Sequence, residues 1–312
     1  MSGWTTLVPA ETLAIALGRP DLAVIDCRFS LMNPGAGEMA YQLGHVPGAV
    51  YAHLDRDLSD QRKHGQGRHP WPDAADFTAK LGAWGIGPST QVVAYDDGDG
   101  AYAARLWFML RALGHEKVAI LDGGWLRWTA IGLPVDSHVP APMRQRYVGE
   151  FDRSRLLDAD QVQQRLDAGD LLIDARGAER FRGDSEPMDK VAGHVPGARN
   201  RPFTTNLVDQ RFKAPVVLAA EFRDLLGDHP GTSLLKDGTL GSDLVAFDFA
   251  EYAPTNKGFK PMVREQAFDV LGVVGRVRLQ QEVSAVSRHV AAGPHSPRIR
   301  SRTAAGWDRN GW

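Results

Sequence analysis

The sequence predicts an α/β protein made of two tandem copies of one unit, each a parallel β-sheet flanked by helices. Two motifs indicate the duplication. The segment GHVPGA at residues 44–49 returns at residues 193–198, which is 149 residues later. An apolar run that ends in Asp26 is echoed 148 residues later by a run that ends in Asp174. Two different motifs with nearly the same offset point to an internal repeat, and the 312 residues suit two domains of roughly 150 residues each.

Alternating helical and apolar segments predict the fold of each unit. In the first unit, helical patterns cover residues 10–17 and 104–113, and the second unit has one at residues 159–166. Short apolar runs predict buried strands at residues 24–25, 91–95, 118–121 and 171–173. Such alternation is typical of a parallel sheet with helices on both faces.

The same patterns divide the chain into segments. The first domain is expected over residues 1–139, and residues 140–158, which carry prolines and charges, are the expected linker. The start of the second domain is expected over residues 159–229. Residues 230–312 diverge from the repeat, so the second domain is predicted to be incomplete.

The composition narrows the class of protein. Lys and Arg number 36 and Asp and Glu 38, a net charge of −2, so we expect no nucleic-acid or membrane partner attracted by bulk charge. No apolar run approaches about 18 residues, and the N-terminus has no basic segment before an apolar one, which together predict a cytoplasmic protein. The single cysteine, Cys27, excludes an internal disulfide and a cysteine-rich zinc site.

The loop DDGDG at residues 96–100 follows a predicted strand and precedes a predicted helix. Ligands of parallel sheets bind at the carboxyl ends of the strands. Backbone N–H groups in such a strand–loop–helix unit favour an anion or a thiolate. A calcium site is not predicted, because Trp107 stands where the loop would need a glutamate.

Further motifs stand at the ends of the predicted strands. They are IDCR at residues 25–28, LDGGW at 121–125, DAR at 174–176 and ERFRG at 179–183. With the two GHVPGA segments, these motifs resemble those of the two-domain rhodaneses, the thiosulfate and 3-mercaptopyruvate sulfurtransferases. The resemblance spans about residues 1–227. It implies two rhodanese-like domains, of which the first lacks activity and the second carries a cysteine that accepts sulfur as a persulfide.

The resemblance also implies site residues. Arg180 matches the arginine that binds the anionic donor, and His69 matches a first-domain histidine that assists the mercaptopyruvate enzymes. Asp55 is the implied acidic partner of this histidine, although a difference of one residue in length leaves Asp57 as an alternative. A second basic contact of the mercaptopyruvate type would fall near Asp189, which has the opposite charge. The implied partners are a small anionic sulfur donor and a thiol or cyanide acceptor, with no cofactor and no metal.

Each candidate has a structural alternative. His69 lies among polar residues, which are also typical of an exposed loop without a function. Arg180 stands beside Glu179 and Arg182, and three such residues also form solvated ion-pair clusters on protein surfaces.

Three other residues are interpreted as structural. Cys27 ends a predicted buried strand, and its counterpart in the second unit is a small apolar residue, Ala175. His45 and His194 occur in both units, and an inactive domain would not need a catalytic base. We therefore expect all three side chains to serve packing or turn geometry.

The resemblance stops where the nucleophile should be. The repeat offset from Asp96 points to residues 244–245, yet the chain has no second cysteine, and LGS at residues 240–242 only faintly echoes the family's Cys-Gly-Ser loop. From residue 271 onward there are seven Arg and two acidic residues. Three hypotheses fit: a translated frameshift after about residue 229, which we favour, a genuine replacement, and an insertion followed by decay. In the first case another reading frame of the coding DNA should encode a Cys-Gly-Ser-Gly or Cys-Arg-Lys-Gly segment.

The resemblance implies a sulfurtransferase that moves sulfane sulfur from thiosulfate or 3-mercaptopyruvate to cyanide or a thiol. The missing nucleophile predicts weak or no activity for this chain, since no Ser or Asp can form a persulfide. The alternative is a non-catalytic anion-binding or interaction protein that keeps Arg180. A phosphatase of the same fold is less favoured, because it would need the same loop cysteine.

Overall fold

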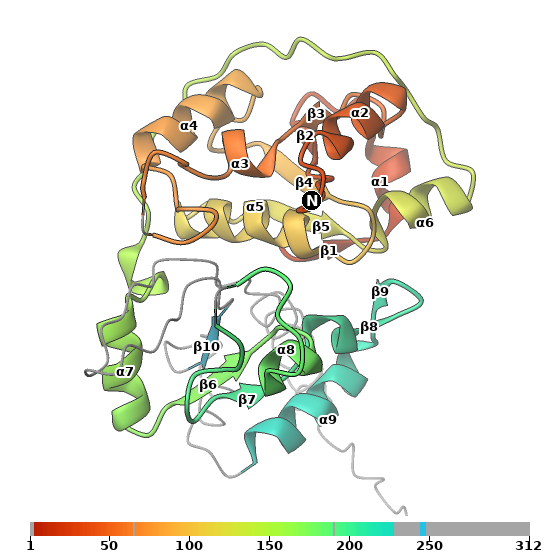
Figure 1. Ribbon diagram of the computed structural model, residues 1–312. Coiled ribbons are helices and arrows are strands. Elements are labelled where there is room, and N and C mark those ends of the chain that lie inside the picture. The colour runs from red at the N-terminus through yellow and green to blue at the C-terminus, as the bar shows by residue number, and fades with distance from the viewer. Residues whose placement is uncertain (1–2, 65, 190, 228–243, 248–312) are drawn as a thin grey trace, which may run out of the picture.

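The structure is a computed structural model that describes residues 3–64, 66–189, 191–227 and 244–247. Two α/β domains stack on one another, the first above the second in Figure 1. Most of the divergent C-terminal segment, with the proposed frameshift and the LGS echo, lies outside the described residues. Nothing in the described chain therefore tests the three hypotheses for that segment, and the predicted domain limits likewise stay predictions.

A five-stranded parallel sheet forms the centre of the first domain, in the order β1-β5-β4-β2-β3. Its strands are β1 (Leu7–Val8), β2 (Leu22–Asp26), β3 (Val50–Tyr51), β4 (Gln91–Tyr95) and β5 (Val118–Leu121). The predicted strands of this domain are confirmed, because their short apolar runs are buried on both faces as central parallel strands require.

Helices cover both faces of this sheet. They are α1 (Ala10–Ala16), α2 (Ala36–Leu43), α3 (Leu54–Asp57), α4 (Ala74–Ala83), α5 (Ala101–Ala112) and α6 (Gly124–Ala130). Successive residues of a strand point to opposite faces. Val92 and Ala94 of β4 accordingly lie in the apolar cluster with α3, α4 and α5, whereas Val93 lies in the cluster with α1 and α6. The fold class predicted for this unit is therefore confirmed.

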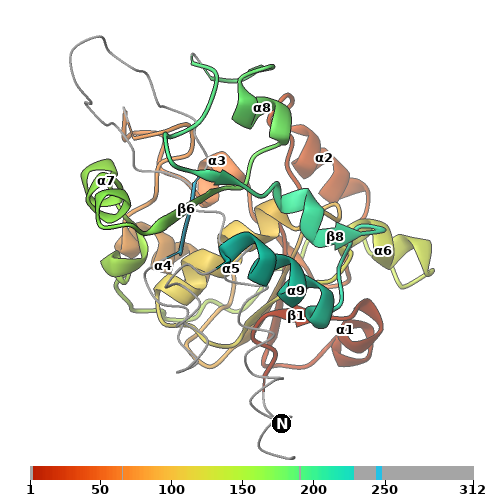
Figure 2. The ribbon, with the colours of Figure 1, turned by 90° about the horizontal axis from the view of Figure 1, so that it is seen from below.

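Helix α5 is buried on nearly its whole surface, because the second domain covers the side that faces away from the sheet. Phe203 and Phe212 of the second domain pack against the apolar cluster that contains α5. Seen from below, the second domain lies in front of this helix (Figure 2). The contact between the domains is thus partly a hydrophobic core.

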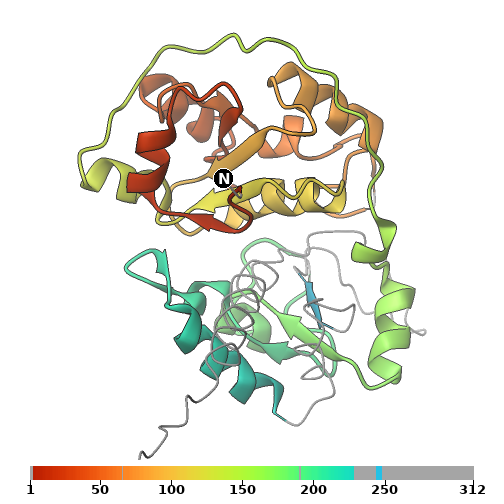
Figure 3. The same ribbon diagram turned by 180° about the vertical axis from the view of Figure 1, so that it is seen from behind.

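Residues 131–152 contain no helix or strand and cross the first domain from α6 toward the second domain (Figure 3). The backbone N–H of Gln145 donates to the Gly82 carbonyl at 2.9 Å. Phe151 stacks on Phe77 with the ring centroids 5.8 Å apart. This part of the predicted linker is therefore packed on the first domain.

The second domain repeats the start of the first. Its elements are η1 (Arg153–Arg155), α7 (Ala159–Asp167), β6 (Leu171–Asp174), α8 (Ala178–Arg182), β7 (Arg199–Asn200), η2 (Phe203–Asn206), β8 (Leu207–Val208), β9 (Arg211–Phe212), α9 (Pro215–Leu226) and β10 (Leu244–Phe247). Within the described residues its parallel sheet has three strands, in the order β10-β6-β7. Helix α7 packs on one face of β6, where Val162 meets Leu172, and α9 packs on the other.

Strand β10 (Leu244–Phe247) occupies the residues where the repeat offset predicts the nucleophile, so the strand before the nucleophile lies a few residues later in the chain than predicted. It pairs with β6 so that Phe247 lies opposite Asp174. In the first domain, β4 pairs with β2 so that Tyr95 lies opposite Asp26. The equivalent register shows that β10 is the counterpart of β4.

The duplication extends to individual contacts. The guanidinium of Arg28 donates to the Asp26 carboxylate, with Nη2 and Oδ2 2.7 Å apart, and its Nη2 also donates to the Gly44 carbonyl at 2.6 Å. Arg176 makes the same bonds to Asp174 at 2.7 Å and to Gly193 at 2.6 Å. Each pair joins the end of its strand, β2 or β6, to the GHVPGA turn, which explains why IDCR and DAR recur.

The two repeated histidines hold backbone groups. Nδ1 of His45 lies 2.7 Å from the Tyr41 carbonyl oxygen, and the two rings stack at 4.0 Å. Nδ1 of His194 lies 2.6 Å from the Phe181 carbonyl oxygen, again with stacked rings. These contacts agree with a structural interpretation of both residues. Among the described residues, no helix is long and apolar enough to cross a membrane.

Candidate functional site

The loop after β4 binds a carboxyl side chain of its own. Oδ1 of Asp96 accepts hydrogen bonds from the backbone N–H groups of Gly98 and Gly100, and Oδ2 accepts those of Tyr102 and Ala103, all at 3.0–3.1 Å. The side chain is buried. These four N–H groups form the anion cradle that the sequence predicts for a strand–loop–helix unit. A carboxylate fills it here, so the first domain presents no reactive group at this position.

Helix α6 begins directly against this loop. The N–H of Trp125 donates to the Asp96 carbonyl at 2.8 Å. A Cβ on Gly124 would lie 2.5 Å from the same oxygen, and Gly124 has φ of +52°, a left-handed conformation that favours glycine. The close approach explains the paired glycines of the LDGGW motif.

The hairpin of β8 and β9 closes the adjoining part of the domain interface. The N–H of Phe212 donates to Oδ1 of Asp122 at 3.0 Å, and Nε of Arg211 donates to Oδ2 at 3.0 Å. A pocket of about 450 Å³ beside the hairpin is lined by these residues and by Leu7 and Leu218. Asp122 of the first domain and Arg211 of the second pair with one another in this lining, so the pocket lies at a contact between the domains.

His69 and Asp55 form the second candidate cluster, in the first domain. Nδ1 of His69 lies 2.9 Å from Oδ1 of Asp55 at the start of α3. Asp57, the alternative partner, accepts hydrogen bonds from Nζ of Lys80 at 2.8 Å and from the backbone N–H of His53 at 2.9 Å. The structure therefore brings Asp55 to His69, and the closeness of the carboxylate favours the tautomer with the proton on Nδ1.

His69 is buried, so the exposed-loop alternative is wrong for this residue. Its side chain is 6% exposed, and Phe29 packs against its ring. Nη2 of Arg105 donates to the His69 carbonyl at 2.9 Å. Burial, reinforced by the charges of Arg105 and Arg68, lowers the pKa of His69 to about 3. The imidazole is consequently neutral near pH 7, and so low a pKa makes it a weak base.

The low pKa of His69 predicts a pH dependence of stability. An unfolded histidine has a pKa of about 6.5, so below that pH the unfolded chain binds a proton that folded His69 does not. The free energy of unfolding therefore falls as the pH drops from about 6.5 toward 3. In His69→Gln this contribution is absent, and we expect urea unfolding to depend less on pH between about 6.5 and 4. The exposed His64 provides the control, since His64→Gln should keep the slope of the parent. Parallel curves for His69→Gln and the parent would contradict the assignment.

Arg180 lies on α8 in a network of ion pairs that reaches the first domain. Its Nη2 donates to Oδ2 of Asp189 at 2.6 Å, and its Nε donates to the Glu186 carboxylate at 3.1 Å. The other oxygen of Asp189 accepts a bond of 2.5 Å from Nη2 of Arg68. Arg180 does not form the solvated ion-pair cluster with Glu179 and Arg182 that was its structural alternative, because Arg182 pairs with Asp184 instead.

The carboxylates of Glu186 and Asp189 are nearly inaccessible to solvent. Burial raises the pKa of Asp189, although the charge of Arg68 opposes the rise. Burial also acts on Glu186, but hydrogen bonds from Arg180 and from two backbone N–H groups bring its pKa below the ordinary value. Glu186 therefore stays ionised and fixes the guanidinium of Arg180.

Cys27 is not placed for sulfur transfer. The residue is 1% exposed and belongs to the apolar cluster beneath α5. Burial, reinforced by the charge of Asp26, raises the pKa of the thiol far above its usual range. Since the thiolate is the nucleophile, this thiol is inert. The nucleophile's position directly follows the strand, as Asp96 follows Tyr95 in the first domain. By the register of β10 the equivalent residue in the sequence is Asp248, which follows Phe247, so no cysteine stands at this position.

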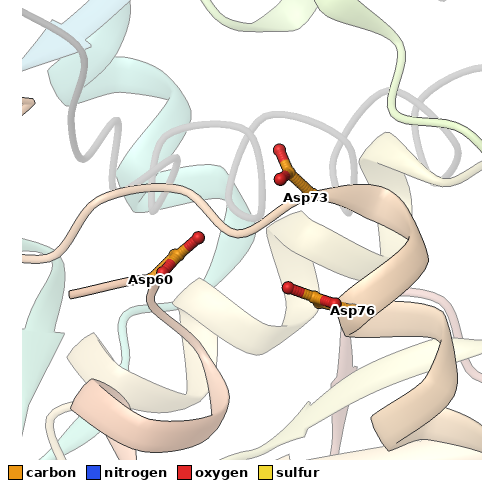
Figure 4. Close-up of side chains that lie close together, drawn as sticks. All are labelled: Asp60, Asp73 and Asp76. Atoms are coloured by element: carbon orange, nitrogen blue, oxygen red, sulfur yellow. The ribbon is translucent and has the colours of Figure 1, made fainter. Parts of the chain in front are cut away.

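One group of carboxylates has the spacing of metal ligands. Oxygens of Asp60, Asp73 and Asp76 lie within 4.8 Å of one another, and the three side chains converge in Figure 4. Arg62 bonds to Asp60 at 2.7 Å and to Asp76 at 2.6 Å, and Lys63 bonds to Asp73 at 2.7 Å. Each of the three carboxylates is thus paired with a cation of the chain itself, so we assign the cluster no metal.

The sequence alone did not predict that Arg68 and Glu186 belong to the ion-pair network of Arg180. Arg68 meets Asp189 across 121 positions of the chain, and no periodicity links residues so far apart. One signal was available, because the resemblance already placed Asp189 where a positive charge is usual. A carboxylate at that position needs cations from elsewhere, and the structure supplies them from both domains.

Comparisons with known proteins agree with this arrangement. Residues 9–131 match the rhodanese-like domain family. The chain is 46% identical over 233 residues to the probable 3-mercaptopyruvate sulfurtransferase of Pseudomonas aeruginosa, which covers 73% of this chain and 82% of the relative. It is 33% identical over 224 residues to the thiosulfate sulfurtransferase of Cricetulus griseus, covering 69% of this chain and 74% of that protein.

Solved structures show the same fold. The crystal structure of the 3-mercaptopyruvate sulfotransferase SseA from Escherichia coli superposes with a TM-score of 0.61 at 29% identity, over 71% of this chain and 84% of that one. High identity over most of a relative's length, the repeated Arg–Asp pairs and the two-domain architecture lead to one conclusion. The chain belongs to the rhodanese family of sulfurtransferases.

Proposed function

We propose that this chain binds the anionic donor of sulfur transfer, thiosulfate or 3-mercaptopyruvate, between its two domains. In the proposed reaction the outer sulfur of thiosulfate, or the thiol sulfur of 3-mercaptopyruvate, passes to cyanide or to a thiol, and sulfite or pyruvate leaves. Arg180 is the proposed anchor of the donor, and His69, held beside Asp55, is the histidine proposed to assist the transfer. The proposal extends to this chain the activities named for its relatives.

The observation that carries the proposal is the convergence of cations at the domain interface. Arg68 precedes His69 in the chain and reaches across to the network of Arg180. The network therefore connects the proposed anchor of the donor with the loop that carries His69. Guanidinium groups bind carboxylate and sulfur oxyanions well because their donors form a planar fork.

The chain's own chemistry favours donor binding without turnover as the second candidate function. A persulfide needs a thiolate that attacks the outer sulfur of the donor. The thiol of Cys27 is the only one in the sequence, and it is buried with a raised pKa. We therefore infer an anion-binding protein with the architecture of a sulfurtransferase.

Thiocyanate formation by the full chain separates the two candidates. With thiosulfate or 3-mercaptopyruvate and cyanide, we expect no turnover above that of Cys27→Ser, together with donor binding in titration calorimetry. The result follows from the burial of the single thiol. Turnover that Cys27→Ser abolishes would establish catalysis and reject the inert interpretation of Cys27. The absence of donor binding, or binding unchanged in Arg180→Gln, would reject the proposed function.

A further inference from the structure

Asp189 occupies the position between two arginines that an anionic ligand would be expected to take. One carboxylate oxygen accepts from Arg68 of the first domain at 2.5 Å, and the other accepts from Arg180 of the second at 2.6 Å. Two cations from different domains that converge on one carboxylate form a binding site for a carboxylate. The occupant in this structure comes from the protein itself.

This site is built rather than superficial. The Asp189 side chain is 3% exposed, and that of Arg180 is 16% exposed. Glu186 accepts a bond from Nε of Arg180 at 3.1 Å and also accepts the backbone N–H of Asp189 at 3.0 Å. The segment that carries Asp189 is thus anchored next to the arginine that its carboxylate binds.

Within the described part of the chain, Arg68, Arg176 and Arg180 face the carboxylates of Asp174, Glu186 and Asp189. An added anion would bring further negative charge to these carboxylates, which is unfavourable in a poorly solvated site. The departure of one carboxylate from the arginines offsets the charge of an arriving donor. Asp189 is the candidate to leave, since Asp174 closes the structural pair with Arg176 and Glu186 is fixed by backbone N–H groups.

We propose that Asp189 is a built-in competitor for the donor site: an anionic donor binds by displacing the Asp189 carboxylate from Arg180 and Arg68. The inference rests on the proposed function, because it takes Arg180 as the anchor of the donor. Donor binding then exchanges one anion for another between the domains. Asp189 sets the affinity for the donor without contacting it.

Titration calorimetry on the full chain tests this inference, with thiosulfate and with pyruvate as a carboxylate probe that carries no sulfur. Asp189→Asn keeps the shape of the side chain and removes its charge, so we expect both probes to bind at least about tenfold tighter than to the parent, a change of about 1.4 kcal/mol. Asp189→Glu keeps the competing charge and should gain no affinity. Asp184→Asn, at an exposed ion pair with Arg182, should bind as the parent does.

The outcomes distinguish the two levels of the proposal. If Asp189→Asn binds both probes no more tightly than the parent, the inference is overturned. The proposed function still stands in that case if Arg180→Gln loses the binding of the donor. If Asp189→Glu gains as much as Asp189→Asn, a loosened interface explains the gain and the inference also fails. If neither the parent nor Asp189→Asn binds a probe, the inference and the proposed function are both rejected. Urea unfolding of each variant verifies that the interface pair with Arg68 can be lost without loss of the fold.

Discussion

Arg28→Ala is expected to lower the free energy of unfolding of the first domain by about 3–5 kcal/mol, because it leaves the buried Asp26 carboxylate without its cation. Asp26 is fully buried and accepts bonds from the Arg28 side chain, the Arg28 backbone N–H and the Tyr95 hydroxyl. The variant also removes the bond from Arg28 to the Gly44 carbonyl and the contact with the Trp125 ring. A buried charge that loses its partner destabilises far more than an exposed one.

The duplicated contact supplies a matched control. Arg176→Ala breaks the same set of bonds in the second domain. Six of the eight tryptophans lie within residues 1–130, at positions 4, 71, 84, 107, 125 and 128. Tryptophan fluorescence during urea unfolding should therefore shift strongly to lower denaturant in Arg28→Ala and much less in Arg176→Ala. Far-ultraviolet circular dichroism should detect the loss in both variants. Equal shifts in tryptophan fluorescence would show that the domains do not unfold separately.

The backbone of the first domain could be predicted because its signals are local. Each strand is a short apolar run, and the runs that end at Asp26 and Asp174 recur with the turn that their arginines bind. A strand that is buried on both faces lacks the alternation of polar and apolar residues that marks a half-exposed strand. Such strands are therefore recognised by the length of the apolar run and by the polar residue that follows it. These features lie within a few residues of one another in the chain.

The site could be predicted only in part, because its contacts join distant residues. Asp55 and Asp57 both lie on α3, and their spacing alone does not identify the partner of His69. Lys80 of α4 decides between them by binding Asp57, a contact between residues 23 positions apart. The pair of Arg68 and Asp189 depends on how the domains stack, which no pattern within either domain encodes.

Asp96→Ala is expected to lower the free energy of unfolding by about 3 kcal/mol, because four buried backbone N–H groups lose their acceptor. The carboxylate is the one group in the loop that reaches Gly98, Gly100, Tyr102 and Ala103 together. Asp99→Ala serves as the control. Asp99 accepts a single exposed N–H, that of Ala101, so its loss should cost no more than about 1 kcal/mol. Similar losses in the two variants would show that the cradle contributes no more than an ordinary helix cap.

An added anion tests what the cradle can hold. Asp96→Ala keeps the Cβ and opens space for a small carboxylate, so formate should raise the urea midpoint of this variant and leave that of the parent unchanged. The effect follows from N–H groups that converge at the start of a helix and retain their preference for negative charge. Rescue by formate would mean that the first domain keeps an anion cradle and is inactive because its own carboxylate fills it. A midpoint of Asp96→Ala that does not respond to formate would mean that the loop collapses without Asp96, and the cradle would then exist only around that side chain.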